Sequence, residues 1–338
     1  MSDNVYIQSN EPEGNRVLAF RRDPDGTLTQ RGTFSTGGAG TGTPHLQSQG
    51  SVILTGDSRH LLVTNAGSGD LSVFATGEDV LTLLHTIPTS GDTPRSVTEH
   101  GGLVYVLNTD GPSLAGFIFQ DGGITPFSDT PRALPNGSDP AQVGFVPDGT
   151  GIVVTNRGTN SITLYPVDES GRLGEPVEQP SSGPTPYGFA FANDGALVVT
   201  EAFGAQKGKA AASSYVLSSR SIRPVSGSVS NGRSEICWAV ATNDGRYAFT
   251  TNFADGAVSR YAVNADGTLS LEDATAGIAV DGETGLRDED LSRDGRFLYV
   301  LNADSRRILG WAVGADGTLS PLGAWDGLPA SAAGLAAS

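Results

Sequence analysis

Charged and polar side chains recur at two kinds of position in this sequence. One lies just before a short apolar run, and the other lies just after the apolar run that follows it. The first place holds His45, Gln47, Arg95, Gln142, Tyr187, Glu235 and Arg287, and the second holds Arg157 and Glu201. Guanidinium groups bind carboxylate or phosphate through paired hydrogen bonds, whereas imidazole and carboxylate groups accept protons. If the fold gathers these side chains, they can bind an anionic small molecule and transfer a proton.

Roles within this set follow from residue type. We expect His45 or Glu201 to be the general base, and Arg95 and Arg287 to hold an anionic group or a developing oxyanion. The remaining members are expected to contact the substrate: Gln47, Gln142, Arg157, Tyr187 and Glu235. Some of these residues could instead have a purely structural role. A buried Glu201 bonded to nearby amides would look the same in sequence, and Arg287 is followed at once by three acidic residues with which it can pair.

The elements that must position these residues are indicated by an internal repeat. A short β-branched or aliphatic phrase ending in Asn occurs again and again along the chain. It ends at Asn65, Asn108, Asn156, Asn252 and Asn302, at a degenerate copy in Asn10, and at Glu201, which replaces the usual Asn. Successive copies lie 43 to 55 residues apart. Seven copies therefore fill the 338 residues, and we expect each Asn to bond the backbone of its own loop.

Two sets of turns divide each repeat into four strands. Asp-Gly between apolar alternating runs is a strong hairpin signal, because Gly accepts a positive φ. Such turns precede the Asn phrase at residues 148–149, 194–195, 244–245 and 294–295, and Asp-Gly-Thr-Leu turns follow it at 25–28, 266–269 and 316–319. Four antiparallel strands per repeat with no helical period are typical of a propeller blade. The sequence predicts an all-β, seven-bladed β-propeller forming one domain over residues 1–338.

Ring closure and the place of the site follow from the same pattern. The first repeat lacks an innermost strand, and residues 329–337 resemble innermost strands such as 186–192, so the C-terminal strand is expected to join the first blade. If strands A to D run outward from the axis, both turn sets lie on one face of the disc. The irregular B–C loops and D–A crossings lie on the other face. Because variable loops on a rigid scaffold carry function, the candidate residues are expected there, in a central pocket.

Composition narrows the class of protein. The formal charge is −16, so a phosphate backbone would be repelled and nucleic acid is not an expected partner. No apolar run is long enough for a membrane helix, and no secretory signal is visible, so a cytoplasmic location is expected.

No dinucleotide, nucleotide-phosphate or cysteine-cluster motif is present, and no cofactor is predicted. A divalent cation held by Glu201, Asn156 and Asn252 is the weaker alternative. The sequence indicates no protein partner.

Several phrases resemble the seven-bladed propeller lactonases, which include a bacterial 6-phosphogluconolactonase and fungal carboxymuconate lactonizing enzymes. They are SRDGRFLYVLN at 292–302, NAGSGDLSVF at 65–74 and GPTPYGF at 183–189. Members of that family often carry Pro-Arg-His at the start of an inner strand. Here Ser96 follows Pro94-Arg95, so the resemblance implies a role for Arg95 and departs from the family at the His.

The residues and the resemblance together predict a hydrolase that opens a sugar or organic-acid lactone by general-base activation of water. A muconate-type cycloisomerase on the same scaffold is one alternative, since the same residue types serve proton transfer without consuming water. A propeller that only binds a partner on its loop face is another.

Overall fold

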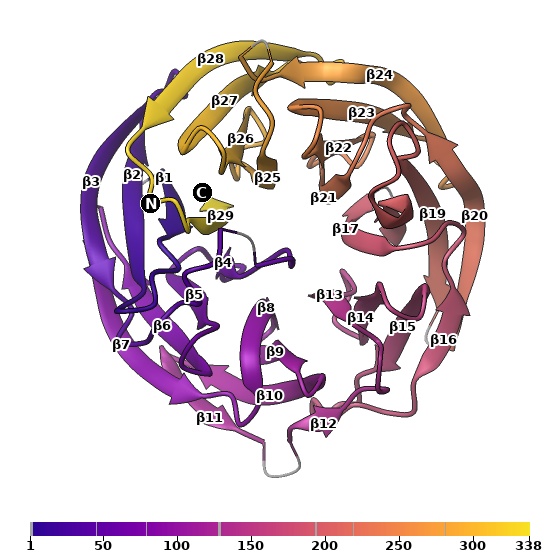
Figure 1. Ribbon diagram of the computed structural model, residues 1–338. Coiled ribbons are helices and arrows are strands. Elements are labelled where there is room, and N and C mark those ends of the chain that lie inside the picture. The colour runs from indigo at the N-terminus through magenta and orange to yellow at the C-terminus, as the bar shows by residue number, and fades with distance from the viewer. Residues whose placement is uncertain are drawn as a thin grey trace.

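The protein is a ring of seven β-sheets around a central axis in this computed structural model (Figure 1). The structure describes residues 3–44, 46–78, 80–127, 130–192, 195–218, 220–280 and 282–338. Neighbouring strands in every sheet are antiparallel, and the predicted seven-bladed propeller is confirmed.

The first three blades contain the following strands, given from the axis outward. Blade 1 contains β29 (Ala333–Ala337), β1 (Asn4–Gln8), β2 (Arg16–Arg22) and β3 (Leu28–Ser35). Blade 2 contains β4 (Val52–Leu54), β5 (His60–Asn65), β6 (Asp70–Thr76) and β7 (Leu81–Pro88). Blade 3 contains β8 (Asp92–His100), β9 (Leu103–Asp110), β10 (Ser113–Gln120) and a divided outer strand, β11 (Gly123–Pro126) and β12 (Arg132–Ala133), both paired with β10.

The other four blades have four strands each. Blade 4 contains β13 (Pro140–Phe145), β14 (Gly151–Asn156), β15 (Ser161–Pro166) and β16 (Val177–Pro180). Blade 5 contains β17 (Pro186–Ala192), β18 (Ala196–Glu201), β19 (Ala211–Ser218) and β20 (Ser221–Ser230), with the short 3-10 helix η2 (Phe203–Ala205) after β18. Blade 6 contains β21 (Ile236–Ala241), β22 (Tyr247–Asn252), β23 (Ala257–Val263) and β24 (Leu269–Ile278). Blade 7 contains β25 (Leu286–Leu291), β26 (Phe297–Asn302), β27 (Arg307–Val313) and β28 (Leu319–Asp326).

The hydrophobic core is divided among the seven interfaces between blades. Each interface holds one cluster of buried apolar side chains, because alternate residues of every strand face the neighbouring sheet. Buried tyrosines add hydrogen bonds across several interfaces by donating to the backbone of a neighbouring blade. Tyr299 donates to the carbonyl of Gly26 at 2.7 Å, and Tyr261 donates to Val229 at 3.1 Å. The blades therefore support one another around the whole ring.

The ring closes through β29, as the sequence predicts. β29 pairs with β1 from Val5↔Ala337 onward, and the Ser338 hydroxyl accepts a hydrogen bond from the Asn4 amide at 2.7 Å. The free inner edges of several innermost strands are covered by side chains of the preceding blade. On β29 this partner is the Asp290 carboxylate, which accepts the Ala337 amide at 2.9 Å. Backbone donors that would otherwise face the axis unpaired are thereby satisfied.

The loops after each B strand depart in part from the sequence prediction. Asn302 accepts hydrogen bonds from the amides of Asp304 and Ser305, both at 3.1 Å, as expected for a residue that holds its own loop. Asn65 and Asn156 instead donate to hydroxyls on the next strand of the blade, Ser72 at 2.7 Å and Thr163 at 2.9 Å. Most copies of the Asn phrase thus join strands B and C, which fixes the blade ends that carry the loops.

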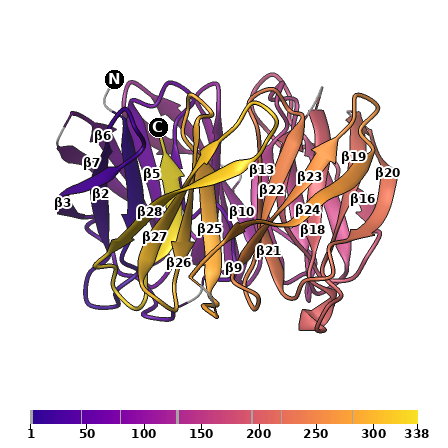
Figure 2. The same ribbon diagram turned by 90° about the horizontal axis from the view of Figure 1, so that it is seen from above.

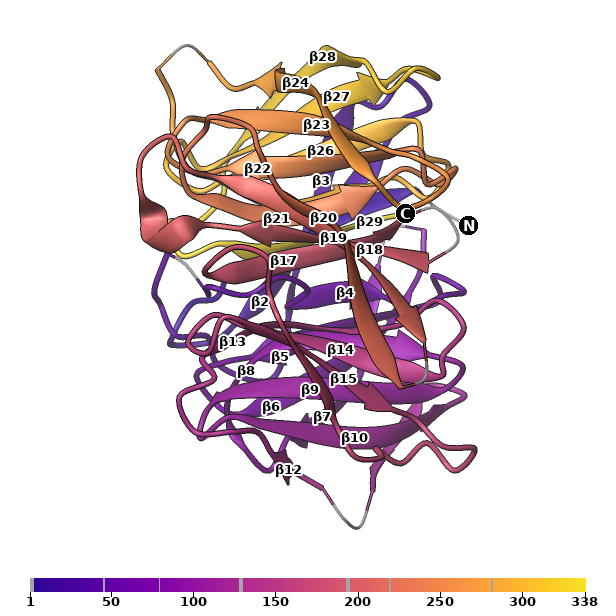
Figure 3. The ribbon, with the colours of Figure 1, turned by 90° about the vertical axis from the view of Figure 1, so that its right-hand side faces the viewer.

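The two faces of the disc differ, as Figures 2 and 3 show from the side. The helix η2 projects from the face that carries the D–A crossings and B–C loops, which we call the loop face. On this face the segment 46–50 reaches over the axis before entering β4 (Figure 1). Its Gln49 side chain spans to blade 6, donating to the Ala239 carbonyl at 2.8 Å and accepting the Ala239 amide at 3.1 Å. The segment therefore bridges the centre of the ring.

Candidate active site

A repeated backbone feature begins the innermost strand of five blades on the loop face. A residue with positive φ is followed two positions later by a bulge residue that is left out of the strand pairing. The positive-φ residues are Thr93, Asp139, Thr185, Glu235 and Gly285. The first bulge residues are Arg95, Ala141, Tyr187, Cys237 and Arg287. A β-branched residue such as Thr at positive φ costs of order 1–3 kcal/mol, and such strain clusters at functional sites.

Arg95, Arg157 and Tyr187 come from three consecutive blades and lie together beside the axis. Arg157 donates to the Tyr187 hydroxyl at 3.0 Å, and its guanidinium lies 4.9 Å from the centre of the Tyr187 ring. Burial lowers the pKa of Arg95, and the nearby positive charge of Arg157 lowers it further. The carboxylates of Asp110 and Asp139 oppose this effect. Two guanidiniums are thus held close together, which favours an anionic ligand.

Arg287 approaches the same cluster from blade 7. Its side chain is buried, and its guanidinium lies 4.9 Å from the centre of the Phe253 ring. Burial lowers the pKa of Arg287, whereas the charge of Asp288 raises it. Tyr187 is within electrostatic reach of both Arg287 and Arg95, so these three side chains share one region. We call Arg95, Arg157, Tyr187 and Arg287 the axial cluster.

The two predicted glutamines, Gln142 and Gln47, lie in different surroundings. Gln142 is buried and pairs with the inner edge of blade 5, accepting the Phe189 amide at 2.7 Å and donating to the Phe189 carbonyl at 3.1 Å. Its amide is therefore used in joining blades. Gln47 is exposed, has φ 54°, and belongs to the segment that bridges the ring. Its neighbour Ser48 donates to the Ala141 carbonyl of blade 4.

Glu235 directly precedes β21, the innermost strand of blade 6. It is half-buried, has φ 54°, and its carbonyl accepts the Phe253 amide at 2.9 Å. Its charge contributes to the raised pKa of Cys237, although burial is the main cause of that shift. Among the residues that the structure describes, the Glu235 carboxylate accepts no hydrogen bond, whereas its carbonyl also accepts the Cys237 thiol at 3.4 Å.

Glu201 occupies a different environment from the one its sequence position suggests. It is fully buried, and its carboxylate accepts the Gly183 amide at 2.7 Å, the Ser213 hydroxyl at 2.6 Å and the Ser228 hydroxyl. Burial raises its pKa against the opposing effect of these bonds. The group ties β18 to β19, β20 and the crossing into blade 5, and does not lie at the mouth of a pocket. This geometry favours the structural reading of Glu201.

His45 lies outside the described residues, and its predicted role stays a prediction. Of the proposed cation ligands, Glu201 and Asn252 already accept hydrogen bonds through their side-chain oxygens. Asn156 donates its amide nitrogen to Thr163, and its Oδ1 has no hydrogen-bond partner among the described residues. Over the ranges that the structure describes, no three His, Cys, Asp or Glu side chains gather in a way that would hold a metal ion.

Sequence reasoning missed Phe253 and Asp139. Phe253 follows Asn252 as Arg157 follows Asn156, so its place in the repeat marks it as a loop-face residue. Asp139 precedes Pro140 as Thr93 precedes Pro94, and the same comparison would have placed it at the start of an inner strand. Aligning the seven repeats position by position was the available signal for both.

Comparisons with known proteins agree with this architecture. A family model described as "Lactonase, 7-bladed beta-propeller" matches residues 8–130 and 123–208. A search of curated proteins gives no match. Among the described residues, no helix has the length and apolar character of a membrane span.

Three solved structures show the same fold at low identity. A Lactobacillus plantarum protein has a TM-score of 0.78 at 18% identity, covering 99% of each chain. A candidate 6-phosphogluconolactonase from Bacteroides fragilis has a TM-score of 0.74 at 19% identity, covering 100% of this chain and 98% of that one. The periplasmic gluconolactonase of Pseudomonas aeruginosa has a TM-score of 0.74 at 20% identity, covering 98% of this chain and 99% of that one. With a family model matching more than half of its length, this chain belongs to the seven-bladed beta-propeller lactonases.

Proposed function

We propose that the protein hydrolyses the lactone of a sugar acid or other organic acid at the axial cluster. Family membership supports lactone chemistry in general. The residues of the loop face support a reaction in which negative charge gathers on an oxygen beside the axis. The substrate is expected to carry or develop that charge beside Arg95 and Arg287, each of which lies within electrostatic reach of Tyr187.

One observation carries the proposal. The Nε atom of Arg95 and the Nε and Nη1 atoms of Arg287 are buried without a hydrogen-bond partner among the described residues. A buried N–H left unpaired costs about 1–3 kcal/mol, and more when the group is charged. Three such atoms from two blades, placed at the strained ends of inner strands, favour a ligand that supplies oxygen acceptors.

The reaction follows from these groups. A base removes a proton from water as its oxygen attacks the lactone carbonyl carbon, and the carbonyl oxygen takes up negative charge beside a guanidinium. Collapse of this intermediate breaks the ring C–O bond, and the departing alkoxide receives a proton, giving a hydroxy acid. Glu235, a half-buried carboxylate beside the start of β21, is the proposed base, and His45 is the predicted alternative. Glu201 is assigned no part in this chemistry because its carboxylate is fully engaged.

Hydrolysis of glucono-δ-lactone and of its 6-phosphate tests the proposal directly. Removing one oxyanion donor typically lowers kcat by ~10²–10³-fold. We therefore expect Arg95→Ala and Arg287→Ala to lower kcat/KM by that order without lowering the thermal midpoint. Arg223→Ala is the matched control, because Arg223 is exposed on the outer strand β20.

The possible results separate the function classes. A product heavier than the lactone by one water supports hydrolysis, whereas a product of unchanged mass identifies an isomerase. Absence of turnover across δ- and γ-lactones would refute the enzymatic proposal and favour a binding propeller. Equal loss of activity and thermal stability in Arg95→Ala would make Arg95 a structural residue.

A further inference from the structure

A hydrogen-bonded clamp between the entry to strand A and the exit from strand B recurs on the loop face, and blade 4 reverses it. In blade 3 the hydroxyl of Thr93, at the start of β8, donates to Asp110, the last residue of β9, at 3.1 Å. In blade 7 Thr284 donates to Asp304 in the same way at 2.6 Å. In blade 4 the acid moves to the D–A crossing, as Asp139, and the B–C loop supplies a cation. Blade 4 thus carries a guanidinium directly after its Asn, one position before the place that Asp110 and Asp304 hold in their repeats.

The reversed clamp holds that guanidinium by several contacts. Asp139 Oδ1 accepts Arg157 Nη2 at 2.6 Å, and the Asp139 carbonyl accepts the Arg157 backbone amide at 3.1 Å. The Arg157 side chain is only 10% exposed. Its other terminal nitrogen, Nη1, is thereby left aimed at the Tyr187 hydroxyl of blade 5. Asp139 itself adopts φ 45°, a strained conformation that the loop maintains.

From this geometry we propose that Asp139 is a positioning residue, which acts through Arg157 on Tyr187 and Arg95 without touching substrate. The inference rests on the proposed function, because it concerns the same cluster. The Asp139 carboxylate fixes the direction of the Arg157 fork. It also offsets the charge that Arg157 brings close to Arg95. Arg157, so held, donates to the phenol oxygen of Tyr187, which makes the Tyr187 O–H a stronger donor toward an oxyanion.

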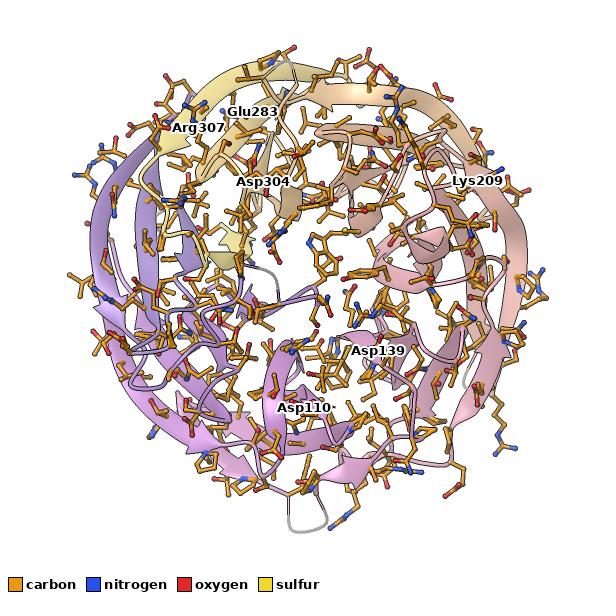
Figure 4. All side chains as sticks on the ribbon, in the orientation of Figure 1. Asp110, Asp139, Lys209, Glu283, Asp304 and Arg307 are labelled. Atoms are coloured by element: carbon orange, nitrogen blue, oxygen red, sulfur yellow. The ribbon has the colours of Figure 1, made fainter. Side chains whose placement is uncertain are left out.

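The three acidic residues of these clamps lie at different places around the ring. Asp139 and Asp110 lie near the axial opening on neighbouring blades, and Asp304 lies across the opening from them (Figure 4). Asp304 accepts a threonine hydroxyl and also raises the pKa of Arg287 through its charge, so its loss would affect one local contact and one charge interaction. Loss of the Asp139 carboxylate would release a cation that contacts the next blade. The expected effect is therefore larger at Asp139 and reaches blade 5.

Two measurements test the inference on the full-length protein. Labelling of arginines by phenylglyoxal, read peptide by peptide, reports how firmly Arg157 is held and does not depend on turnover. In Asp139→Asn we expect Arg157 to label faster than in the wild type, approaching the rate of the exposed Arg223. Displacing a catalytic group by about 1 Å can cost ~10²-fold in rate, so kcat/KM on glucono-δ-lactone should fall by up to that factor.

The controls make each outcome decisive. Asp255→Asn removes the acid of the blade 6 clamp, which accepts the Ser234 amide, and should leave both readouts near wild type. In an Arg157→Ala background, Asp139→Asn should cause no further loss of activity. Additive losses, or an unchanged labelling rate of Arg157, would overturn the inference. If the wild type hydrolyses no lactone, the proposed function fails, and the labelling rate alone still decides whether Asp139 holds Arg157.

Discussion

The innermost strand of blade 7, β25, carries an acidic run beside β29, and ionisation of this run should destabilise the ring. Asp288, Glu289 and Asp290 follow one another on β25, and burial raises the pKa of Asp290 to about 7 despite hydrogen bonds from the amides of Ala337 and Leu291. Burial also raises the pKa of Asp288 to about 6, and raises that of Glu289, with the charge of Asp290 adding to the shift at Glu289. The folded protein thus binds protons that the unfolded chain releases.

The sign and size of the effect follow from linkage. Asp290 has an ordinary pKa of 3.8, so between about pH 4 and pH 7 the folded state holds a proton that the unfolded state has lost. The contribution of Asp290 to stability is fully present below its ordinary pKa of 3.8 and is lost as the pH rises through about 7. At about 1.4 kcal/mol per pKa unit, ionising Asp290 in the folded protein costs at most ~4 kcal/mol.

Asp290→Asn removes this cost and keeps an oxygen acceptor for the Ala337 amide. We expect the substitution to raise the free energy of unfolding by a few kcal/mol at about pH 8.5 and to change it little at about pH 4, as measured by reversible urea denaturation. Asp244→Asn is the control with opposite sign. Burial favours the neutral form of Asp244, but hydrogen bonds from Thr242 and Arg246 give it a net lowered pKa, so its loss should destabilise at pH 8.5. A destabilised Asp290→Asn at pH 8.5 would refute the reasoning.

Two further predictions concern buried groups. Glu201→Ala should lower the free energy of unfolding by roughly 3 kcal/mol or more, because the Gly183 amide and the Ser213 and Ser228 hydroxyls lose their acceptor. Activity per folded molecule on a hydrolysed lactone should persist, and its loss at unchanged stability would make Glu201 catalytic. Cys237 is buried, and burial raises its pKa to about 12, so a thiol reagent should react with it only on unfolding. Rapid stoichiometric reaction of the native protein would contradict this placement.

The fold was predictable because its signals are local. Asp-Gly turns and alternating apolar runs specify hairpins within each repeat, and the repeat itself specifies the ring. Closure by β29 was also readable, since the first repeat lacks a strand that the end of the chain supplies. The divided outer strand of blade 3 was not expected, because only four residues pair as β11 and two as β12.

The site was only partly predictable because its geometry depends on contacts between blades. Arg95 and Arg287 were identified from their place in the repeat, yet no sequence rule marks Thr93 as a residue of positive φ. The pairing of Arg157 with Tyr187 joins residues 30 positions apart on different blades. Glu201 was misleading for the same reason. Its hydroxyl partners Ser213 and Ser228 are recognisable only when β19 and β20 are placed beside β18.

The pairing of β1 with β29 has a consequence for synthesis. β1 leaves the ribosome well before its partner, which lies more than 300 residues later. At roughly 5–20 residues per second, the inner edge of β1 waits some tens of seconds before β29 exists. During that interval the nascent chain presents an open strand edge, which can recruit another chain as readily as its own. Translation speed and chaperone occupancy should therefore govern the yield of correctly closed rings.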